Sequence, residues 1–461
     1  MRILVLMLMF SLSWYAGAEE SNAKVQIDIN QAKTRKSLVA LPPLQFLGSP
    51  ASAPGFNKTG AELFKIIQND LTVSTYFQFI SQSAFLEDST KTTLRPNSPT
   101  EPSGFKFDSW KQIGSEFLIR GGFTIIGDSL TLEIYAYSVS RGTLAFGKKY
   151  KGTLATARRI AHTFANDFME NVTGTAGIFL SRVAFSSDRA GNKFREVYIM
   201  DWDGANVEPL TNHKSVAISP SLSPDGSKVA YTAFVQRAKS KTRNADLFIY
   251  ELQTGKRWLV SYRQGLNSGS NFAADGKHIF LTISSNQNPD IYKMTYDGTV
   301  VERITDGPHG AMNVEPAISP DGKRLAFSSD RSGQPMIWVV ELEGKKLKRI
   351  TFAGKYNSTP SWSPDGKKLV FAGWESDHFD IFTMDVDGSN MVRITSSKKA
   401  NGKWANNEDP VFSADGRLLM YTSNRTGNSQ IYISNLDGSE ERRITVDGFN
   451  YFKPRWSKNL D

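Results

Sequence analysis

Three carboxylates and one ammonium group lie on short segments between β-rich stretches in the C-terminal part of the sequence. They belong to Glu315, Glu408, Asp409 and Lys453. Carboxylates that converge from separate loops are typical ligands of a hard cation such as Ca²⁺. Mixed charges on loops held by a rigid scaffold are also typical of protein-binding surfaces. The sequence therefore predicts a docking surface in which Glu315, Glu408 and Asp409 could hold Ca²⁺; the alternative is a set of solvated loop charges.

Indications of enzymatic chemistry are poor. The sequence contains no Gly-x-Ser-x-Gly nucleophile motif, no phosphate-cradling glycine loop and no cysteine. Ser186–Arg189 and Ser328–Arg331 both spell Ser-Ser-Asp-Arg, but a motif that repeats along the chain favours a structural role. His213, His309 and His378 lie on separate loops and are a weak indication of a metal. We expect no catalytic residue and no cofactor other than the Ca²⁺ considered above.

The segments that carry these residues belong to a repeat. Pro-Asp-Gly or Ala-Asp-Gly turns have their aspartates at 225, 275, 321, 365 and 415, which are 50, 46, 44 and 50 residues apart. A second series of turns lies between them, and most of its members are followed by Arg-Ile-Thr. Two turns and four short β-rich runs per repeat are typical of a four-stranded propeller blade.

The count of turns predicts how the ring closes. The second series has six turns, from Asp203-Gly204 to Asp437-Gly438, whereas the first series has only five. One blade therefore lacks its first strand. The end of the chain repeats that strand, because Pro454–Ser457 resembles Pro360–Ser363. We predict a six-bladed β-propeller in which Phe452–Ser457 pairs with the stretch that begins near Arg182 and removes the open sheet edges.

Strand order divides the loops between two faces. Both series of Asp-Gly turns lie on one face, and the blade-to-blade connections lie on the other. The connections enter the innermost strands through Ser219, Gly269, Glu315, Thr359, Asp409 and Lys453, which should surround the mouth of the central channel. A basic loop with Arg237, Lys239, Lys241 and Arg243 is expected on the same face, either solvated or against an acidic partner.

Upstream of the propeller the pattern changes. Residues 1–18 contain Arg2, an apolar run from Ile3 to about Leu12 and the small-x-small site at Ala16–Ala18, which together predict a secretory signal peptide cleaved near Ala18. The apolar run is too short to cross a bilayer of ~30 Å. Residues 19–175 mix helical and strand periodicity and predict an α/β domain with an extended N-terminal segment. Residues 176–461 form the propeller.

Composition excludes several classes of protein. The 461 residues are 39% hydrophobic and 22% charged, so neither a disordered chain nor a polytopic membrane protein is expected. The absence of cysteine excludes disulfides, thiolate metal sites and a lipid-modified N-terminal cysteine. A net charge of +9 over this length is too weak to indicate nucleic-acid binding.

A cleaved signal, an α/β domain and six blades with Ser-Pro-Asp-Gly-Lys and Asp-x-Asp-Gly turns together resemble the TolB family of periplasmic propellers in the Tol-Pal system. The resemblance covers essentially the whole chain. It implies a non-enzymatic adaptor that links the lipoprotein Pal, and thus the outer membrane and peptidoglycan, to TolA. It also implies roles in outer-membrane invagination during division and in envelope integrity, and use in colicin import. The protein would be a monomer that reaches membranes through its partners. These partners would include colicins and outer-membrane proteins.

Carried onto this sequence, the resemblance assigns two binding regions. The Pal-facing residues at the channel mouth would be Asn313, Glu315, Tyr356, Asn357, Thr359, Asn407, Glu408, Asp409 and Lys453. The TolA-binding segment would be the N-terminal stretch with Lys24, Val25, Ile27 and Asp28, which alternates like a strand that can join a sheet edge.

Two alternatives to the adaptor remain at this stage. One is a propeller hydrolase or lyase that acts on envelope polymers, and the other is sugar or peptidoglycan binding through Trp374 and Trp404. The third blade also departs from the family pattern, because Asn271–Ala274 stands where a proline-led segment is usual.

Overall fold

The computed structural model describes residues 35–50, 53, 55–191, 193–236, 242–284, 288–308 and 310–460. The chain divides into two compact units, Met1–Ala176 and Gly177–Asp461. Several sequence predictions lie outside the described residues: the signal peptide, the segment with Lys24, Val25, Ile27 and Asp28, the basic residues Arg237, Lys239 and Lys241, and His309.

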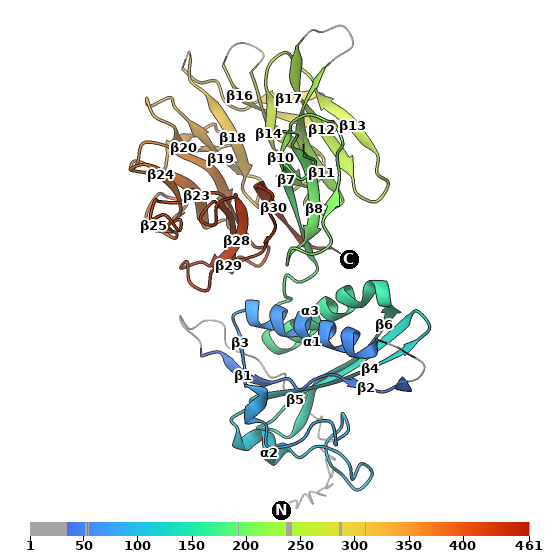
Figure 1. Cartoon of the computed structure of the whole chain (residues 1–461). Coiled ribbons are helices and arrows are strands. Elements are labelled where there is room, and N and C mark those ends of the chain that lie inside the picture. Colours follow the sequence, from blue (N-terminus) through green and yellow to red (C-terminus); the bar gives the residue numbers. More distant parts are fainter. Residues whose placement is uncertain are drawn as a thin grey trace, which may run out of the picture. The chain divides into compact units, whose positions relative to one another are not determined.

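The N-terminal unit is a mixed sheet covered by helices (Figure 1). Its strands run in the order β3-β1-β4-β5-β6, and β2 also pairs with β4. β1 is parallel to β3 and β4, whereas β4, β5 and β6 are antiparallel. The elements are β1 (Ser37–Ala40), β2 (Gln45–Phe46), α1 (Phe56–Val73), β3 (Phe77–Phe79), η2 (Gln82–Ala84), α2 (Phe107–Gln112), β4 (Phe117–Ile126), β5 (Ser129–Ser138), β6 (Thr143–Thr153), η3 (Leu154–Thr156) and α3 (Ala157–Thr173).

The two long helices lie side by side over one face of this sheet (Figure 1). Each buries an apolar stripe at i, i+3 and i+4, such as Leu63, Ile67 and Leu71 in α1. A buried pair between Asp70 Oδ2 and His162 Nδ1, 2.7 Å apart, links α1 to α3. The predicted α/β domain is confirmed. The sequence did not predict α2, because a six-residue helix has too few turns to show a period.

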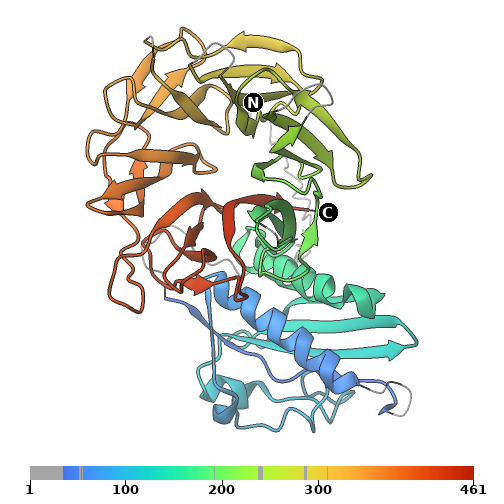
Figure 2. The same cartoon turned by 45° about the horizontal axis from the view of Figure 1, so that its top comes forward.

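The second unit is a ring of six four-stranded sheets (Figure 2). The strands of each blade, from the innermost outwards, are as follows: β30 (Tyr451–Asn459), β7 (Ser181–Ser187), β8 (Glu196–Asp201) and β9 (Glu208–Pro209) in blade 1; β10 (Ala217–Leu222), β11 (Lys228–Gln236), β12 (Arg243–Glu251) and β13 (Arg257–Ser261) in blade 2; β14 (Asn267–Phe272), β15 (His278–Ile283), β16 (Asp290–Thr295) and β17 (Val300–Arg303) in blade 3; β18 (Asn313–Ile318), β19 (Arg324–Ser329), β20 (Met336–Glu341) and β21 (Leu347–Arg349) in blade 4; β22 (Asn357–Trp362), β23 (Lys368–Glu375), β24 (His378–Asp385) and β25 (Val392–Arg393) in blade 5; β26 (Asn407–Phe412), β27 (Leu418–Ser423), β28 (Gln430–Asn435) and β29 (Arg442–Arg443) in blade 6.

The Asp-Gly turns connect strands in the predicted manner. In blade 5, Asp365 Oδ1 accepts the Ser363 hydroxyl at 2.6 Å and the Lys367 N–H at 3.0 Å. Gly366 then adopts φ 68°, a left-handed conformation in which a side chain would be strained. In this turn, a short polar side chain that bonds to its own turn and a glycine that permits positive φ together favour the hairpin.

Hydrophobic cores lie between neighbouring blades. One core joins Ala326 and Ile337 of blade 4 to Trp362, Leu369 and Phe371 of blade 5, all of them buried. Clusters of the same kind join blades 2 and 3, 3 and 4, and 5 and 6. Each blade is therefore stabilised by its neighbours, which makes closure of the ring important for stability.

The C-terminal strand closes the ring, as the count of turns predicts. β30 pairs with β7 in antiparallel register, with Arg455 opposite Ala184 and Trp456 opposite Val183. The Trp456 indole N–H donates to Ser181 Oγ at 2.7 Å. Blade 1 is thus assembled from the first and last strands of the propeller.

Candidate protein-docking site at the channel mouth

Six equivalent residues form a ring at the start of the innermost strands. Each has φ between 50° and 63°, and each interrupts the pairing register between the first and second strands of its blade. They are the predicted mouth residues Ser219, Gly269, Glu315, Thr359, Asp409 and Lys453. Such β-bulges redirect a side chain out of the sheet. All of them except Asp409 line a channel of about 650 Å³.

Three of these ring residues form a charge network. Lys453 Nζ lies 2.7 Å from Glu315 Oε1 and 3.0 Å from Asp409 Oδ1. The other two carboxylate oxygens accept backbone N–H groups: Glu315 Oε2 from Thr359 at 2.8 Å and Asp409 Oδ2 from Lys453 at 3.0 Å. The network therefore joins the innermost strands of blades 4, 5, 6 and 1.

The charges at the mouth shift the pKa of Lys453 and of Glu408. Burial disfavours the charge of Lys453, but the carboxylates of Asp409 and Glu315 outweigh burial and raise its pKa above the ordinary value. Glu408 is exposed, yet the surrounding protein and the neighbouring Asp409 charge raise its pKa to about 7. Asp409 and Glu408 are adjacent in sequence, but only Asp409 is held by Lys453.

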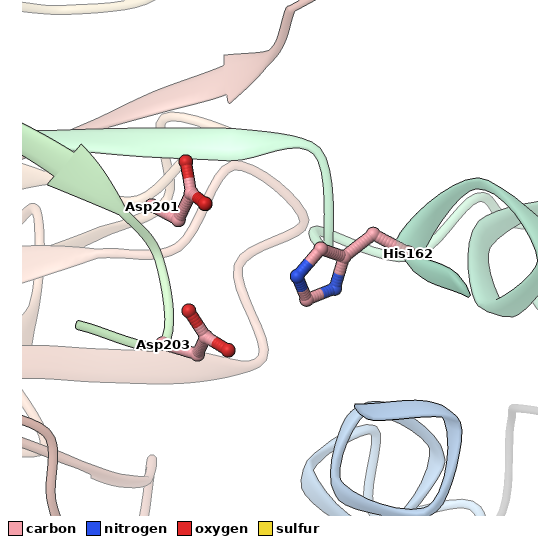
Figure 3. A group of neighbouring side chains, drawn as sticks. All are labelled: His162, Asp201 and Asp203. Carbon is pink, nitrogen blue, oxygen red and sulfur yellow. The ribbon is translucent and has the colours of Figure 1, made fainter. Parts of the chain in front are cut away.

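The residues considered for Ca²⁺ do not converge. Among the described residues, Glu315, Glu408 and Asp409 do not bring one oxygen each within 4.8 Å of one another. Figure 3 labels three further residues of ligand type, His162, Asp201 and Asp203. His162 belongs to the N-terminal unit and both aspartates belong to the propeller. We therefore assign no metal to this set.

Most of the predicted Pal-facing residues are buried. Asn313, Asn357 and Asn407 begin their innermost strands with at most 3% exposure. Thr359 and Asp409 are 7% and 8% exposed. These five side chains are therefore enclosed by the protein itself, and their contact with Pal stays a prediction. The sequence showed only that each of these polar residues stands beside a loop. It could not show that they are buried, because burial depends on contacts with residues from other segments.

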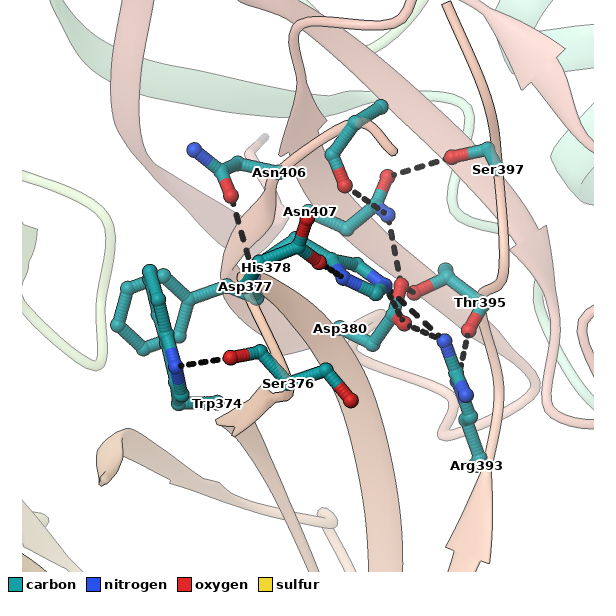
Figure 4. Close-up of polar contacts among 12 residues, drawn as sticks. Trp374, Ser376, Asp377, His378, Asp380, Arg393, Thr395, Ser397, Asn406 and Asn407 are labelled. Carbon is teal, nitrogen blue, oxygen red and sulfur yellow. Dashed lines mark hydrogen bonds and ion pairs between the residues drawn. The ribbon is translucent and has the colours of Figure 1, made fainter. Parts of the chain in front are cut away.

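The buried asparagines that begin the innermost strands hold these strand ends in place, and the contact between blades 5 and 6 is an example (Figure 4). Asn407 Nδ2 donates to Asp380 Oδ1 at 2.8 Å, and the Thr395 hydroxyl donates to the same oxygen at 2.7 Å. Arg393 and His378 bind the other oxygen, Asp380 Oδ2. Asp290 and Asn313 repeat the contact at 2.8 Å. Apart from Arg393, whose side chain is 36% exposed, the network around Asp380 is buried, and it joins blade 5 to the innermost strand of blade 6.

The exposed residues of the site lie on the connections and at the mouth. Tyr356 is 41% exposed, Met312 is 42% exposed and Phe352 is 72% exposed. The Tyr356 ring packs edge-on against Phe379 with centroids 5.6 Å apart, which fixes its position. Tyr356 lines the channel, whereas Met312 and Phe352 lie on the connections that lead to the innermost strands of blades 4 and 5. Phe352 was not among the sequence-predicted residues, because an isolated aromatic after Arg-Ile-Thr carries no motif.

Sugar binding through the two tryptophans finds little support. The Trp404 ring stacks on His378 at 4.8 Å, and Lys398 Nζ lies 4.6 Å from its centroid. The Trp374 ring packs edge-on against Phe379 at 4.8 Å, and its N–H donates to Ser376 O at 3.2 Å. Both rings are held by contacts within the propeller, and Trp404 keeps 37% of its surface exposed.

The repeated Ser-Ser-Asp-Arg segments have structural partners. Asp330 Oδ1 accepts the Met312 N–H at 2.7 Å, and Arg331 donates to Asn313 Oδ1 at 2.6 Å. In blade 1, Asp188 Oδ1 accepts the Asn450 N–H at 2.8 Å in the same way. These residues fix the start of an innermost strand.

Sequence comparison identifies the family. The chain matches the family described as the TolB beta propeller domain over residues 169–403 and 359–461. It matches the TolB amino-terminal domain over residues 25–145. The chain belongs to the TolB family.

Curated relatives in this family are named as Tol-Pal system proteins, not as enzymes. The chain is 33% identical over 281 residues to the Tol-Pal system protein TolB of Desulfosudis oleivorans, and the match covers 60% of each chain. It is 35% identical over 238 residues to the TolB homolog of Chlorobium chlorochromatii, which covers 52% of this chain and 51% of that protein. The matched regions thus span only half to three fifths of these relatives.

A solved structure has the same fold. The crystal structure of TolB from Acinetobacter baumannii superposes with a TM-score of 0.73 at 22% identity, and the match covers 94% of this chain and 99% of that chain. In the part of this chain that the structure describes, no helix combines the length and the apolar character needed to cross a membrane.

Proposed function

We propose that this chain is a periplasmic adaptor of the Tol-Pal system that binds Pal at the channel mouth of its propeller. Membership of the TolB family supports a place in this system. The signal-peptide pattern of residues 1–18 supports export. The adaptor supports outer-membrane invagination and envelope integrity, and colicins use it for import.

The observation that carries the proposal is a group of exposed apolar side chains on the blade-to-blade connections. Met312, Tyr356 and Phe352 expose apolar surface on the connections that lead into blades 4 and 5, and Tyr356 lines the channel together with Glu315 and Lys453. Aromatic residues and methionine are enriched at protein interfaces. The Tyr356 ring packs edge-on against Phe379, so this side chain is held in place before binding and loses little entropy on binding.

The second partner is TolA, which the N-terminal segment with Lys24, Val25, Ile27 and Asp28 binds. Its alternation of polar and apolar residues supports addition of this segment as a strand to a partner's sheet edge. The chain thereby links Pal at the outer membrane and peptidoglycan to the inner membrane.

Cross-linking in intact cells tests the proposal. The full-length chain, tagged at its C-terminus, is captured after cross-linking of the envelope, and bound proteins are identified by mass spectrometry. Pal and TolA should be enriched over an exported propeller of another family that serves as the control. If neither Pal nor TolA is enriched, the proposed function is wrong.

A further inference from the structure

One of the six blade-to-blade connections is longer than the ring requires. The connections run from the threonine or serine at positions 211, 261, 305, 351, 395 and 445 to the innermost strand of the next blade. Four of them have five residues (212–216, 262–266, 352–356 and 446–450), one has seven (306–312) and one has eleven (396–406). Five residues are therefore enough to join two blades, and the additional residues of the connection 396–406 are not needed for closure of the ring.

The additional residues form a β-hairpin, 397–405, with a fixed backbone. Lys398 and Trp404 face each other as an antiparallel bridge. The Lys399 N–H donates to the Lys403 carbonyl oxygen at 2.8 Å, and the turn between them has Gly402 at φ 78°. Hairpin 397–405 thus presents its side chains from a backbone that its own hydrogen bonds hold in place.

Hairpin 397–405 is basic. Its connection contains Lys398, Lys399 and Lys403 but no acidic residue. Lys398 and Lys403 are exposed and Lys399 is half-buried, and in the part of the chain that the structure describes none of the three ammonium groups forms an ion pair. The Lys398 ammonium lies 4.6 Å from the centroid of the Trp404 ring, a contact that leaves its positive charge uncompensated. The hairpin therefore presents three positive charges beside a tryptophan that is 37% exposed.

Hairpin 397–405 borders the proposed docking residues. The Phe379 N–H donates to Asn406 Oδ1 at 3.1 Å, and the Tyr356 ring packs edge-on against Phe379. A protein that contacts Tyr356 can therefore also reach the hairpin. The Trp404 ring is stacked on His378 with centroids 4.8 Å apart, so it is held against the blade and not free to enter a bilayer. A tryptophan in a fixed position with charged residues at the rim is typical of protein interfaces, which favours a protein over a lipid surface.

We infer that hairpin 397–405 is a basic rim of the docking face that attracts an acidic surface of the protein bound at the channel mouth. The inference rests on the proposed function and adds the chemistry of the partner's surface to it. Charges at the rim of an interface act mainly on the rate of association, whereas buried contacts set the rate of dissociation. The three lysines therefore accelerate encounter, and the apolar side chains on the connections hold the complex.

Removal of the three charges tests the inference. The hairpin variant carries Lys398→Gln, Lys399→Gln and Lys403→Gln in the full-length chain, and stopped-flow fluorescence measures its association with the soluble domain of Pal at low and high salt. At low salt the association rate should fall about 10-fold. At ~1 M salt, where screening shortens the reach of the charges, the rate should differ from that of the wild type by less than about 2-fold. The dissociation rate should change by less than about 2-fold, and the Tm should stay that of the wild type.

The matched control removes three lysines from the opposite face of the propeller. Lys277, Lys323 and Lys367 are exposed, and each follows the Asp-Gly turn between the first two strands of its blade. The variant with Lys277→Gln, Lys323→Gln and Lys367→Gln loses the same total charge as the hairpin variant. It should associate with Pal at the rate of the wild type, so that a difference between the two variants reports the position of the charges.

Three outcomes would overturn the inference, and they separate it from the proposed function. Equal association rates of the hairpin variant and the control variant would contradict the inference alone, because the wild type still binds Pal. Absence of Pal binding by the wild-type chain would contradict the proposed function and the inference together. Binding of the wild type to phosphatidylglycerol vesicles that is lost in the hairpin variant, with an unchanged rate of Pal association, would assign the lysines to a membrane surface instead.

Discussion

Adjacent acidic residues at the channel mouth have different environments. Asp409 is buried and binds Lys453 through both oxygens. Loss of solvation next to the surrounding protein and the negative charge of Asp409 raise the pKa of Glu408 to about 7. The positive charge of Lys453 lowers this pKa but offsets only part of the rise. The folded state therefore holds the Glu408 proton more tightly than the unfolded state does. Between the ordinary glutamate pKa and about 7, ionisation of Glu408 lowers the free energy of unfolding as pH rises.

Replacement of Glu408 by glutamine should make this effect visible. The amide that replaces the carboxyl group does not titrate, so the E408Q variant should melt at a higher temperature than the wild type at pH 8 and at nearly the same temperature at pH 5. Thermal unfolding followed by circular dichroism at both values measures this. Glu343→Gln, in an exposed turn of blade 4, is the control and should show no such dependence. An equal Tm difference at pH 5 and pH 8 would contradict the raised pKa.

The strands are stabilised by a side-chain cap that recurs from blade to blade. The hydroxyls of Thr305, Thr351, Thr395 and Thr445 each accept the N–H of an isoleucine in the third strand at 2.9 Å. These threonines end the repeated Arg-Ile-Thr segments. The sequence shows that the segment repeats but not why, because the partner of each threonine is 14 residues upstream.

Loss of one such cap should lower stability measurably. In blade 5, Thr395→Val leaves the buried Ile381 N–H without its acceptor and removes a donor to Asp380. The free energy of unfolding in urea should fall by ~1–3 kcal/mol. Thr383→Val on strand β24 of the same blade, where the described residues give the hydroxyl no side-chain hydrogen bond, should change it by less than ~0.5 kcal/mol. Equal losses in both variants would contradict the capping role.

Contacts between distant segments also limit what the sequence can predict about the candidate site. Alternation and Asp-Gly turns predict the blades because both signals are local in sequence. The buried state of Asn313 and Asn407 could not be predicted, since it depends on Arg331, Asp290 and Asp380 from other segments. A polar residue that precedes a strand looks exposed in sequence and is buried only when its neighbours are known.

The ring as a whole depends on a contact between distant segments. Blade 1 pairs β30 with β7, and nearby Asn450 Nδ2 donates at 2.7 Å to Asp188 Oδ2, 262 residues away in sequence. Counting turns was enough to predict this pairing, because a missing strand in one blade and a spare strand at the chain end are a global property of the sequence. The Lys453 network could not be predicted, since it requires the three-dimensional order of the blades.

Removal of the closing strand should therefore affect every blade. Deletion of residues 451–461 exposes the edge of β7 and removes Lys453 from the channel network. We expect loss of the cooperative melt of the propeller in differential scanning calorimetry. Trp456→Ala, which removes the hydrogen bond to Ser181 and its packing, should give an intermediate loss of ~2–4 kcal/mol. A native cooperative melt in the truncated chain would show that the ring does not need this strand.

The most direct test of the account is the affinity of the full-length chain for the soluble domain of Pal, measured by isothermal titration calorimetry. The double variant Met312→Ser, Tyr356→Ala removes exposed side chains on the connections into blades 4 and 5 but leaves Glu315 and Asp409 to hold Lys453. Val301→Ala, on the outer strand of blade 3 and 49% exposed, is the matched control. The account predicts that the double variant binds Pal at least about 10-fold more weakly, while V301A binds like the wild type. Unchanged affinity in the double variant would contradict docking at the channel mouth.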